Sequence, residues 1–374
     1  MSPRNAIPLG RIFGISIDLD YSWFLIFGLL TWIMAVSYYP REFKNWTHGE
    51  YWVVGALTSV LLFVSVLLHE LGHSLVAIRY GIRVPRITLF IFGGVSQIAT
   101  EPTNAASEFW IAIAGPAVSF ALAVAFRELR VASPQGKPVF ALAEYLAMLN
   151  LVLGIFNLVP GFPLDGGRIF RAIVWGAAKN FRRATAIAGT TGRFFGFLLI
   201  FLGVWQVLGG NVFNGIWIAF IGWYLESAAS SQLREQVFKG LLVGHRVSEV
   251  MNHDFVEVPG SLTLQEMVDQ YVLARGKRSF VVNRVGTDSP GLVTLARIKA
   301  VPRDEWPMTT AGAIMIPPDK LLSIQPNADV WTAFEKMGRD GVNQLPVVDG
   351  KGIVGMLSRD DLVHYLQALQ TVHG

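Results

Sequence analysis

The chain of 374 residues contains no cysteine, which excludes disulfide bonds and any zinc site built from thiolates. It is also poor in charge, because Asp, Glu, Lys and Arg make up only 16% of it, against about a quarter in soluble globular proteins. No basic run with interleaved aromatics is present, so nucleic acid is not an expected partner. Apolar residues account for 52% of the chain. This composition predicts a membrane protein with a smaller soluble part.

Long apolar segments occupy the first part of the chain. A membrane-spanning helix needs roughly 20 mostly apolar residues, and six segments approach that length, although the last is short. They are Tyr21–Tyr39, Trp52–Ile78, Phe109–Phe126, Phe140–Val159, Ile187–Leu208 and Val212–Leu225. The first lacks a small-residue cleavage site, so we expect it to remain as a membrane anchor.

The positive charges predict the orientation, since Lys and Arg concentrate in cytoplasmic loops. With the N-terminus inside, the inner segments carry eleven Lys and Arg residues, whereas the outer loops carry five. We therefore expect a multi-pass protein of the cell membrane, in a prokaryote, with both termini in the cytoplasm.

Two stretches of the membrane half favour strands over helices. Residues 10–20 alternate apolar and polar side chains, which is typical of a short strand pair at the membrane surface. Residues 86–98 are rich in β-branched and aromatic side chains and are interrupted by Gly93 and Gly94. We expect a sheet-like or re-entrant segment there.

An internal repeat follows the membrane half. Val247–Met251 recurs as Ala311–Met315, and Gly291–Thr294 recurs as Gly355–Ser358, in both cases 64 residues later. Repeated units of this kind usually pack against one another. The predicted fold is an α-helical polytopic membrane protein with a small β element, followed by a cytoplasmic α/β module. The predicted domains are a membrane domain (1–228), a linker (229–245) and two repeats (246–307 and 308–374).

The second apolar segment contains the pattern His-Glu-x-x-His at residues 69–73. Histidines four positions apart share one face of a helix, so His69 and His73 can bind one zinc ion while Glu70 acts on its water. Ionisable side chains are costly inside a membrane and are functional there by default. The motif therefore predicts a catalytic zinc site.

Catalytic zinc takes three protein ligands and leaves a fourth position for water. A carboxylate is the expected third ligand, because His48 lies in an outer loop. Glu144 lies near the outer surface, whereas Asp165 follows 21 residues later, about 30 Å further at about 1.5 Å per residue. That distance brings Asp165 to the depth of the histidines, so we predict Asp165 as the third ligand.

Two prolines precede Asp165 and two glycines follow it. This pattern predicts irregular backbone around the site. Such backbone is tolerated at membrane depth where it lines a cavity or is buried in protein. A plain loop would not explain Asn157, whose side-chain amide can donate a hydrogen bond to the oxyanion of a tetrahedral intermediate.

HELGH at 69–73, Gly93-Gly94-Val95, Ala114-Gly115-Pro116 and the run from Asn157 to Arg168 together resemble the site-2 protease family of intramembrane zinc proteases. The resemblance covers about residues 8–226. It implies a zinc metalloendopeptidase that binds one Zn2+ and cleaves membrane-embedded segments near the cytoplasmic face. It also implies that Gly93 and Gly94 help an unwound substrate to lie as a strand. Relatives often carry Asn where this chain has Ser119, a difference expected to affect packing only.

Residues 247–368 resemble a tandem pair of CBS domains, a module that often binds adenine nucleotides. In that family a hydroxyl residue, followed three positions later by Asp, contacts phosphate and ribose; Ser358 and Asp361 match in the second repeat. The first repeat has Thr294, but Arg297 replaces the Asp. The resemblance therefore implies one site for ATP, ADP or AMP; a purely structural dimerisation module is the alternative.

Two other readings of the whole chain remain open. A CBS-gated membrane transporter or channel would explain the two halves, since polar groups in membranes also mark ion pathways. The other is a catalytically inactive relative of the proteases that only binds partners. As a protease in the lipid bilayer, the chain is expected to act on membrane proteins such as anti-sigma factors, pro-sigma factors or signal-peptide remnants. Homo-oligomers through the CBS domains are also expected.

Overall fold

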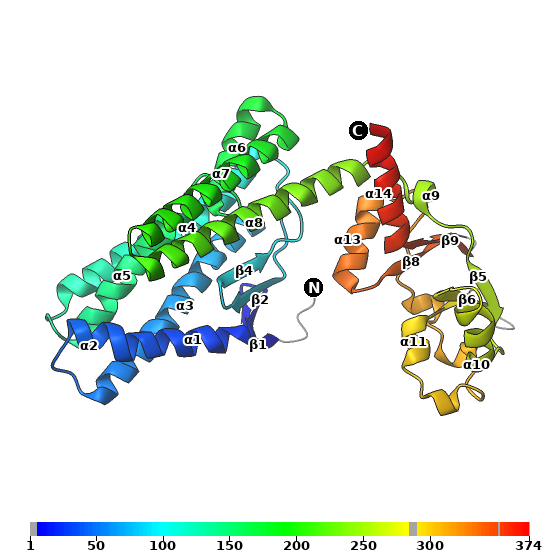
Figure 1. Ribbon diagram of the computed structural model, residues 1–374, viewed down its shortest axis with the longest axis horizontal. Helices are drawn as coiled ribbons and strands as arrows, with labels where there is room; N and C mark the ends of the chain where they lie inside the picture. The colour runs from blue at the N-terminus through cyan, green and yellow to red at the C-terminus, as the bar shows by residue number, and fades with distance from the viewer. Residues whose placement is uncertain (1–5, 284–289, 351, 374) are drawn as a thin grey trace. The chain divides into compact units, whose positions relative to one another are not determined.

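The computed structural model describes residues 6–283, 290–350 and 352–373 (Figure 1). The chain divides into two compact units, one ending at Gln236 and the other beginning at Val237. Five helical segments of the described residues are long and apolar enough to cross a membrane. They are Ser22–Glu42, His48–Arg79, Ala105–Ala132, Pro138–Asn157 and Phe181–Leu208. The sixth predicted segment, Val212–Leu225, lies in a longer helix that is not among these five.

The membrane unit contains α1 (Ser22–Ile33), α2 (Tyr39–Glu42), α3 (His48–Arg79), α4 (Ala105–Ala132), α5 (Pro138–Asn157), α6 (Asp165–Ala178), α7 (Phe181–Leu208) and most of α8 (Val212–Leu242). The central α4 packs against α3, α5 and α6. Small residues permit this, because a side chain at Gly72 of α3 would lie 3.0 Å from the Ala114 carbonyl oxygen of α4. The close packing of α3 on α4 sets up the functional site.

A four-stranded sheet accompanies these helices, as predicted for residues 10–20 and 86–98. Its order is β1 (Ala6–Ile12), β2 (Ile15–Asp20), β3 (Arg86–Phe90) and β4 (Gly93–Gln97). The β2–β3 pair is parallel and the other two pairs are antiparallel. Ile15, Ile17 and Ile87 are buried against Leu71 of α3, so the sheet is anchored to the helix that carries the HExxH motif. β4 is an edge strand of this sheet.

The C-terminal unit contains the two predicted repeats. The first holds α9 (Val247–Val250), β5 (Val256–Pro259), α10 (Leu264–Met267), β6 (Ser279–Asn283), β7 (Gly291–Thr294) and α11 (Leu295–Lys299). The second holds α12 (Ala311–Ile314), α13 (Val330–Asp340), β8 (Gln344–Asp349), β9 (Gly352–Ser358) and α14 (Arg359–His373). Helix α8 continues through residues 229–242, the segment that the sequence analysis assigned to a linker.

The repeats exchange their first segments. Val247, at the start of the first repeat, is buried in the core of the second, whereas Ala311, at the start of the second, is buried in the core of the first. A glycine of each repeat contacts a methionine of the other: a Cβ at Gly291 would lie 2.7 Å from the sulfur of Met315. The expectation that the repeats pack against one another is confirmed.

Candidate metal centre

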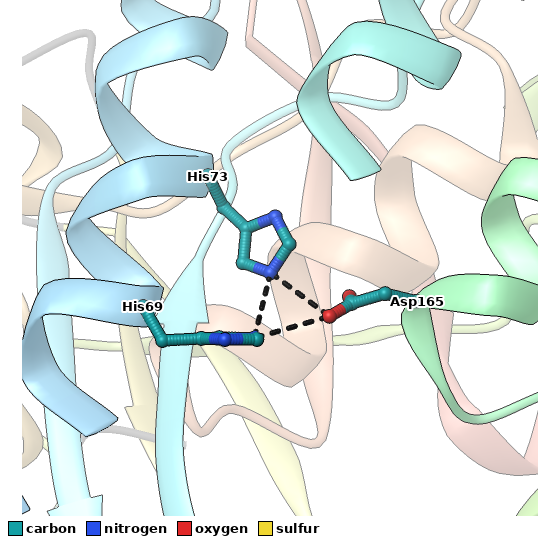
Figure 2. Close-up of side chains that lie close together, drawn as sticks. All are labelled: His69, His73 and Asp165. Atoms are coloured by element: carbon teal, nitrogen blue, oxygen red, sulfur yellow. Dashed lines mark hydrogen bonds and ion pairs between the residues drawn. The ribbon is translucent and has the colours of Figure 1, made fainter. Parts of the chain in front are cut away.

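Three side chains from two helices meet at one point (Figure 2). His69 and His73 point from α3, and Asp165 is the first residue of α6. The Oδ2 atom of Asp165 lies 3.1 Å from the Nε2 atom of each histidine, and the two Nε2 atoms are 3.2 Å apart. Both histidines are buried. The structure therefore brings together the three residues predicted as metal ligands.

The other ring nitrogen of each histidine has its own partner. The Nδ1 atom of His73 lies 2.7 Å from the carbonyl oxygen of Ile111, so it must carry the proton. The Nδ1 atom of His69 lies 2.8 Å from the hydroxyl oxygen of Ser119, which is fully buried. Partners of this kind fix the tautomer of metal-ligating histidines and leave Nε2 free to bind. Ser119 thus contacts a predicted ligand directly, whereas the sequence led us to expect only a role in packing.

The donor set and the surrounding space fit zinc. A tetrahedral zinc ion with bonds of about 2.0–2.1 Å has ligand atoms roughly 3.3 Å apart, close to the observed separations. The backbone of α4 closes one side, since a Cβ atom at Gly115 would lie 2.1 Å from Nε2 of His73. Only glycine at this position leaves room for the two rings. Glycine at 115 and the donor triangle therefore belong to one site.

The charge state of Asp165 also suits a metal ligand. Burial by itself raises the pKa of a carboxyl group. When the histidines are protonated, their charges and hydrogen bonds outweigh burial and lower the pKa of Asp165 below its ordinary value. Zinc, when bound, would take the place of those protons, and the carboxylate is the form of Asp165 that binds a metal.

The glycines after Asp165 explain how its helix reaches this position. A Cβ at Gly166 would lie 2.3 Å from the carbonyl oxygen of Val159, and one at Gly167 would lie 2.4 Å from backbone atoms of Gly161 and Phe162. The first turn of α6 therefore folds back directly onto the segment that follows α5. Side chains at either position would push Asp165 away from the histidines.

A buried ion pair, which sequence analysis missed, ties α6 to α4. The Nε atom of Arg171 donates to Oε1 of Glu108 at 2.7 Å, and a second guanidinium nitrogen contacts the same oxygen. The guanidinium also lies over the rings of Phe162 and Phe181, at 5.0 and 4.8 Å from their centres. Glu108 is fully buried. The one available signal was an acidic residue directly before the apolar segment Phe109–Phe126.

Glu70 lies beside the triangle and contacts the sheet. Its Oε2 atom accepts a hydrogen bond of 2.8 Å from the hydroxyl of Ser96 in β4. A Cβ at Gly94, in the same strand, would lie 2.7 Å from the Cγ atom of Glu70. Gly93 has a φ of +126°, which favours glycine. Both glycines predicted to bind substrate therefore lie on the strand that packs against the predicted base.

Among the described residues, the remaining candidates of the membrane unit form no hydrogen bond or ion pair with the triangle. Asn157 is the last residue of α5 and is half-buried, and its side-chain amide has no hydrogen-bond partner among the described residues. Glu144, the alternative third ligand, forms an ion pair with Arg130 at 3.1 Å. His48 is the first residue of α3, at the opposite end from His73. Neither alternative joins the two histidines.

The C-terminal unit has a cavity of about 1200 Å3 lined by both repeats. Its walls include Thr294, Ser358 and Asp361, together with the cations Lys277, Arg278, Lys299, Lys320 and Arg359. Ser358 and Asp361 form a capping box at the start of α14: the hydroxyl lies 2.5 Å from Oδ2, and the Asp361 amide donates to the hydroxyl at 3.1 Å. Arg297 does not line the cavity and donates to the carbonyl of Ile314 at 3.0 Å.

Comparison with known proteins gives matches over both halves of the chain. The pattern of Peptidase family M50 matches residues 57–135 and 129–200, and that of the CBS domain matches residues 311–368. The "Putative zinc metalloprotease sll0528" of Synechocystis sp. is 34% identical over 368 residues, which cover 97% of this chain and 96% of the relative. The "Putative zinc metalloprotease Rip3" of Mycobacterium tuberculosis is 33% identical over 367 residues, with 97% and 93% covered.

A solved structure named "Site-2 Protease from Methanocaldococcus jannaschii" is 31% identical, covers 61% of this chain and 95% of its own, and superposes with a TM-score of 0.44. The two zinc metalloprotease relatives align with nearly the whole chain, and the residues matched by the M50 pattern include the positions of the donor triangle. The membrane half thus shares its ancestry with metallopeptidases, and the five apolar helices make it a multi-pass membrane protein. The chain belongs to Peptidase family M50, the site-2 proteases, and is a membrane zinc metalloprotease with a CBS domain.

Proposed function

We propose that His69, His73 and Asp165 hold the zinc ion and that the enzyme hydrolyses peptide bonds of membrane-embedded segments near the cytoplasmic face. The triangle of buried donors, with sides of 3.1–3.2 Å, is the observation that supports this most strongly. Its depth supports the cytoplasmic face, because His73 lies near the end of α3 and Asp165 follows the apolar span that ends at Asn157.

Glu70 is the proposed general base. It removes a proton from the attacking water and later delivers it to the leaving amine. The zinc ion, when bound, supplies a Lewis acid that lowers the pKa of water and polarises the scissile carbonyl. Asn157 donates a hydrogen bond from its side-chain amide to the oxyanion. A substrate helix must unwind first, because its carbonyl groups are engaged in its own hydrogen bonds.

The edge strand β4 is the proposed place for the unwound segment. An edge strand offers unpaired backbone groups, to which an extended peptide can add as another strand. Gly93 and Gly94 carry no side chains that would block the approach of a peptide backbone. β4 also carries the residue that contacts Glu70, so a paired substrate would lie beside the base.

The decisive experiment substitutes Glu70→Gln, which keeps the size of the side chain but removes its basicity. We expect cells with the variant to accumulate membrane peptides that the wild type degrades, and the purified variant to keep its zinc. Equal membrane peptidomes would contradict the proposal.

We also propose that both termini lie in the cytoplasm of a prokaryotic cell. Because the chain has no cysteine, single cysteines can be introduced without background labelling. Gln135 and Thr371 are exposed in the structure and lie on opposite predicted sides. An impermeant maleimide added to intact cells should label Gln135→Cys but not Thr371→Cys; the reverse pattern would invert the topology.

A second proposal concerns the cavity between the repeats, which would bind one adenine nucleotide. Five cations line it, against three carboxylates, so its walls favour an anion. Asp361 can accept from ribose hydroxyls and Ser358 can donate to phosphate oxygens. To do so, the capping box that now joins them must share these atoms with the ligand. Thr294 is the matching hydroxyl of the first repeat.

Calorimetric titration of the detergent-solubilised full chain with ATP, ADP and AMP tests this second proposal. We expect saturable heat with at least one nucleotide and a clear loss of affinity in Asp361→Ala. Arg297→Ala is the control, because this side chain lies outside the cavity lining. Absence of heat with all three nucleotides, or equal affinity in Asp361→Ala, would leave the module as a scaffold for homo-oligomers.

The proposed substrates are membrane proteins with a single accessible span: anti-sigma factors, membrane-associated pro-sigma factors or signal-peptide remnants. A site within a membrane requires substrates that enter from the bilayer. Identification of the peptides that accumulate in Glu70→Gln cells would separate these three classes by sequence.

A further inference from the structure

A hydroxyl group from the sheet holds one oxygen of the Glu70 carboxylate. The Oγ atom of Ser96 donates to Oε2 of Glu70 at 2.8 Å. Among the described residues, the other carboxylate oxygen accepts no hydrogen bond. A carboxylate with one oxygen held and one oxygen available has a defined orientation toward any water beside it.

The alternation of β4 explains why this hydroxyl reaches Glu70. Side chains two positions apart point to the same face of a strand, so Gly94 and Ser96 both face α3. Val95, between them, is exposed on the other face. Because Gly94 has no side chain, the strand packs onto the stem of Glu70, and the next side chain facing α3 is Ser96.

The neighbouring strand keeps β4 in this register. Gly94 pairs with Leu89 and Ser96 pairs with Ile87, and both partners on β3 are buried. A shift of β4 by one residue would turn Ser96 away from α3 and direct Val95 toward Glu70. The buried partners therefore fix the position of the hydroxyl as well as the strand.

We propose that Ser96 is a positioning residue for the general base. This inference rests on the proposed role of Glu70. Rotation of a glutamate side chain about its single bonds takes the reactive oxygen away from the water it must deprotonate. The Ser96 hydroxyl limits this rotation and presents Oε1 to the water. Small misplacements of a catalytic group cost large factors in rate, so the hydrogen bond serves the chemical step more than substrate binding.

The variants follow from the geometry. Ser96→Ala removes the hydroxyl and keeps the backbone of β4, whereas Ser96→Thr keeps the hydroxyl and suits a strand. Ser74→Ala is the matched control. Its hydroxyl donates at 2.8 Å to the backbone carbonyl of Glu70 and does not contact the carboxylate. All three variants are made in the full chain and assayed in detergent.

The probe is a single-span peptide with a fluorophore and a quencher, chosen because the wild type cuts it and Glu70→Gln does not. If no such peptide exists, the proposed function itself fails. With the probe in hand, we expect Ser96→Ala to lower kcat by about ten- to a hundredfold at nearly constant KM, with zinc content unchanged. Ser96→Thr should recover most of kcat, and Ser74→Ala should stay within about twofold of the wild type.

Two outcomes would overturn the role of Ser96. Wild-type kcat in Ser96→Ala would show that the hydrogen bond does not matter for turnover. An equal loss in Ser96→Ala, Ser96→Thr and Ser74→Ala, or a loss of zinc in Ser96→Ala, would show that the variants damage the packing of α3.

Discussion

At the scale of single residues, the zinc site depends on a carboxylate that lies far along the chain from its histidines. Substitution of Asp165→Ala removes one of three donors and should strongly reduce the zinc content of the purified protein, because two histidines alone bind zinc weakly. Glu144→Ala is the control, since Glu144 pairs with Arg130 instead. Full zinc retention and normal activity in Asp165→Ala would rule out this ligand.

The role of Asn157 can be separated from helix capping by conservative changes. Asp and Ser also cap helices, so Asn157→Asp and Asn157→Ser should be tolerated if the residue only ends α5. If it donates to the oxyanion, both variants should lower turnover by about ten- to a thousandfold. Turnover and zinc content are measured together, and near-normal cleavage by both variants would leave only the structural role.

At Gly115, one added carbon atom should be enough to affect zinc binding. An added methyl group at Gly115 collides with the ring of His73, so Gly115→Ala should lose most of its zinc. Gly28 of α1 has open space around it, since a Cβ there would meet no atom within 4 Å, and Gly28→Ala should keep its zinc and fold normally. The measurement is the zinc content of both purified variants. Equal zinc contents would show that α4 can move away from the histidines to accommodate the methyl group.

At the scale of helices and strands, the Glu108–Arg171 pair holds α6, and with it Asp165, against α4. Breaking a buried pair from one side leaves a buried charge and costs about 3–5 kcal/mol. We therefore expect Arg171→Met to lower the unfolding temperature and to speed zinc loss to a chelator. The double variant Glu108→Leu with Arg171→Met should recover much of the stability.

A second interhelical pair provides the comparison for this prediction. Arg193 of α7 and Glu226 of α8 lie 3.2 Å apart but are partly exposed. Exposed pairs contribute about 0–1 kcal/mol, so Arg193→Met should change the unfolding temperature little. If Arg193→Met and Arg171→Met have equal effects on zinc loss, the buried pair has no special role in placing Asp165.

The elements differ in how far the sequence could predict them. The HExxH helix, the strands at 86–98 and the repeats follow from local patterns of residues, and the structure confirms them. The Glu108–Arg171 pair could not be predicted, because its members lie 63 residues apart and each alone suits an ordinary cytoplasmic loop. The contact of Ser119 with His69 arises only where α4 crosses α3, 50 residues along the chain.

At the scale of the whole molecule, nucleotide binding would regulate proteolysis only if it favoured one arrangement of the chain over another. Helix α8 is continuous from Val212 to Leu242, and Leu242 is buried in the core of the second repeat. A change in that core would therefore act on the C-terminal end of α8. We expect saturating nucleotide to change the cleavage rate of the wild type severalfold but not that of Asp361→Ala. Equal rates with and without nucleotide in the wild type would contradict regulation.

Because the two repeats exchange their first segments, we expect them to be inherited together. The segment around Val247 completes the second core and the segment around Ala311 completes the first, so a cut at residue 307 divides both cores. Neither repeat can be lost or transplanted alone without exposing apolar surface of the other. The two repeats are therefore expected to be gained or lost together during evolution. Their binding residues can still diverge, because Arg297 of the first repeat occupies the position equivalent to Asp361 of the second.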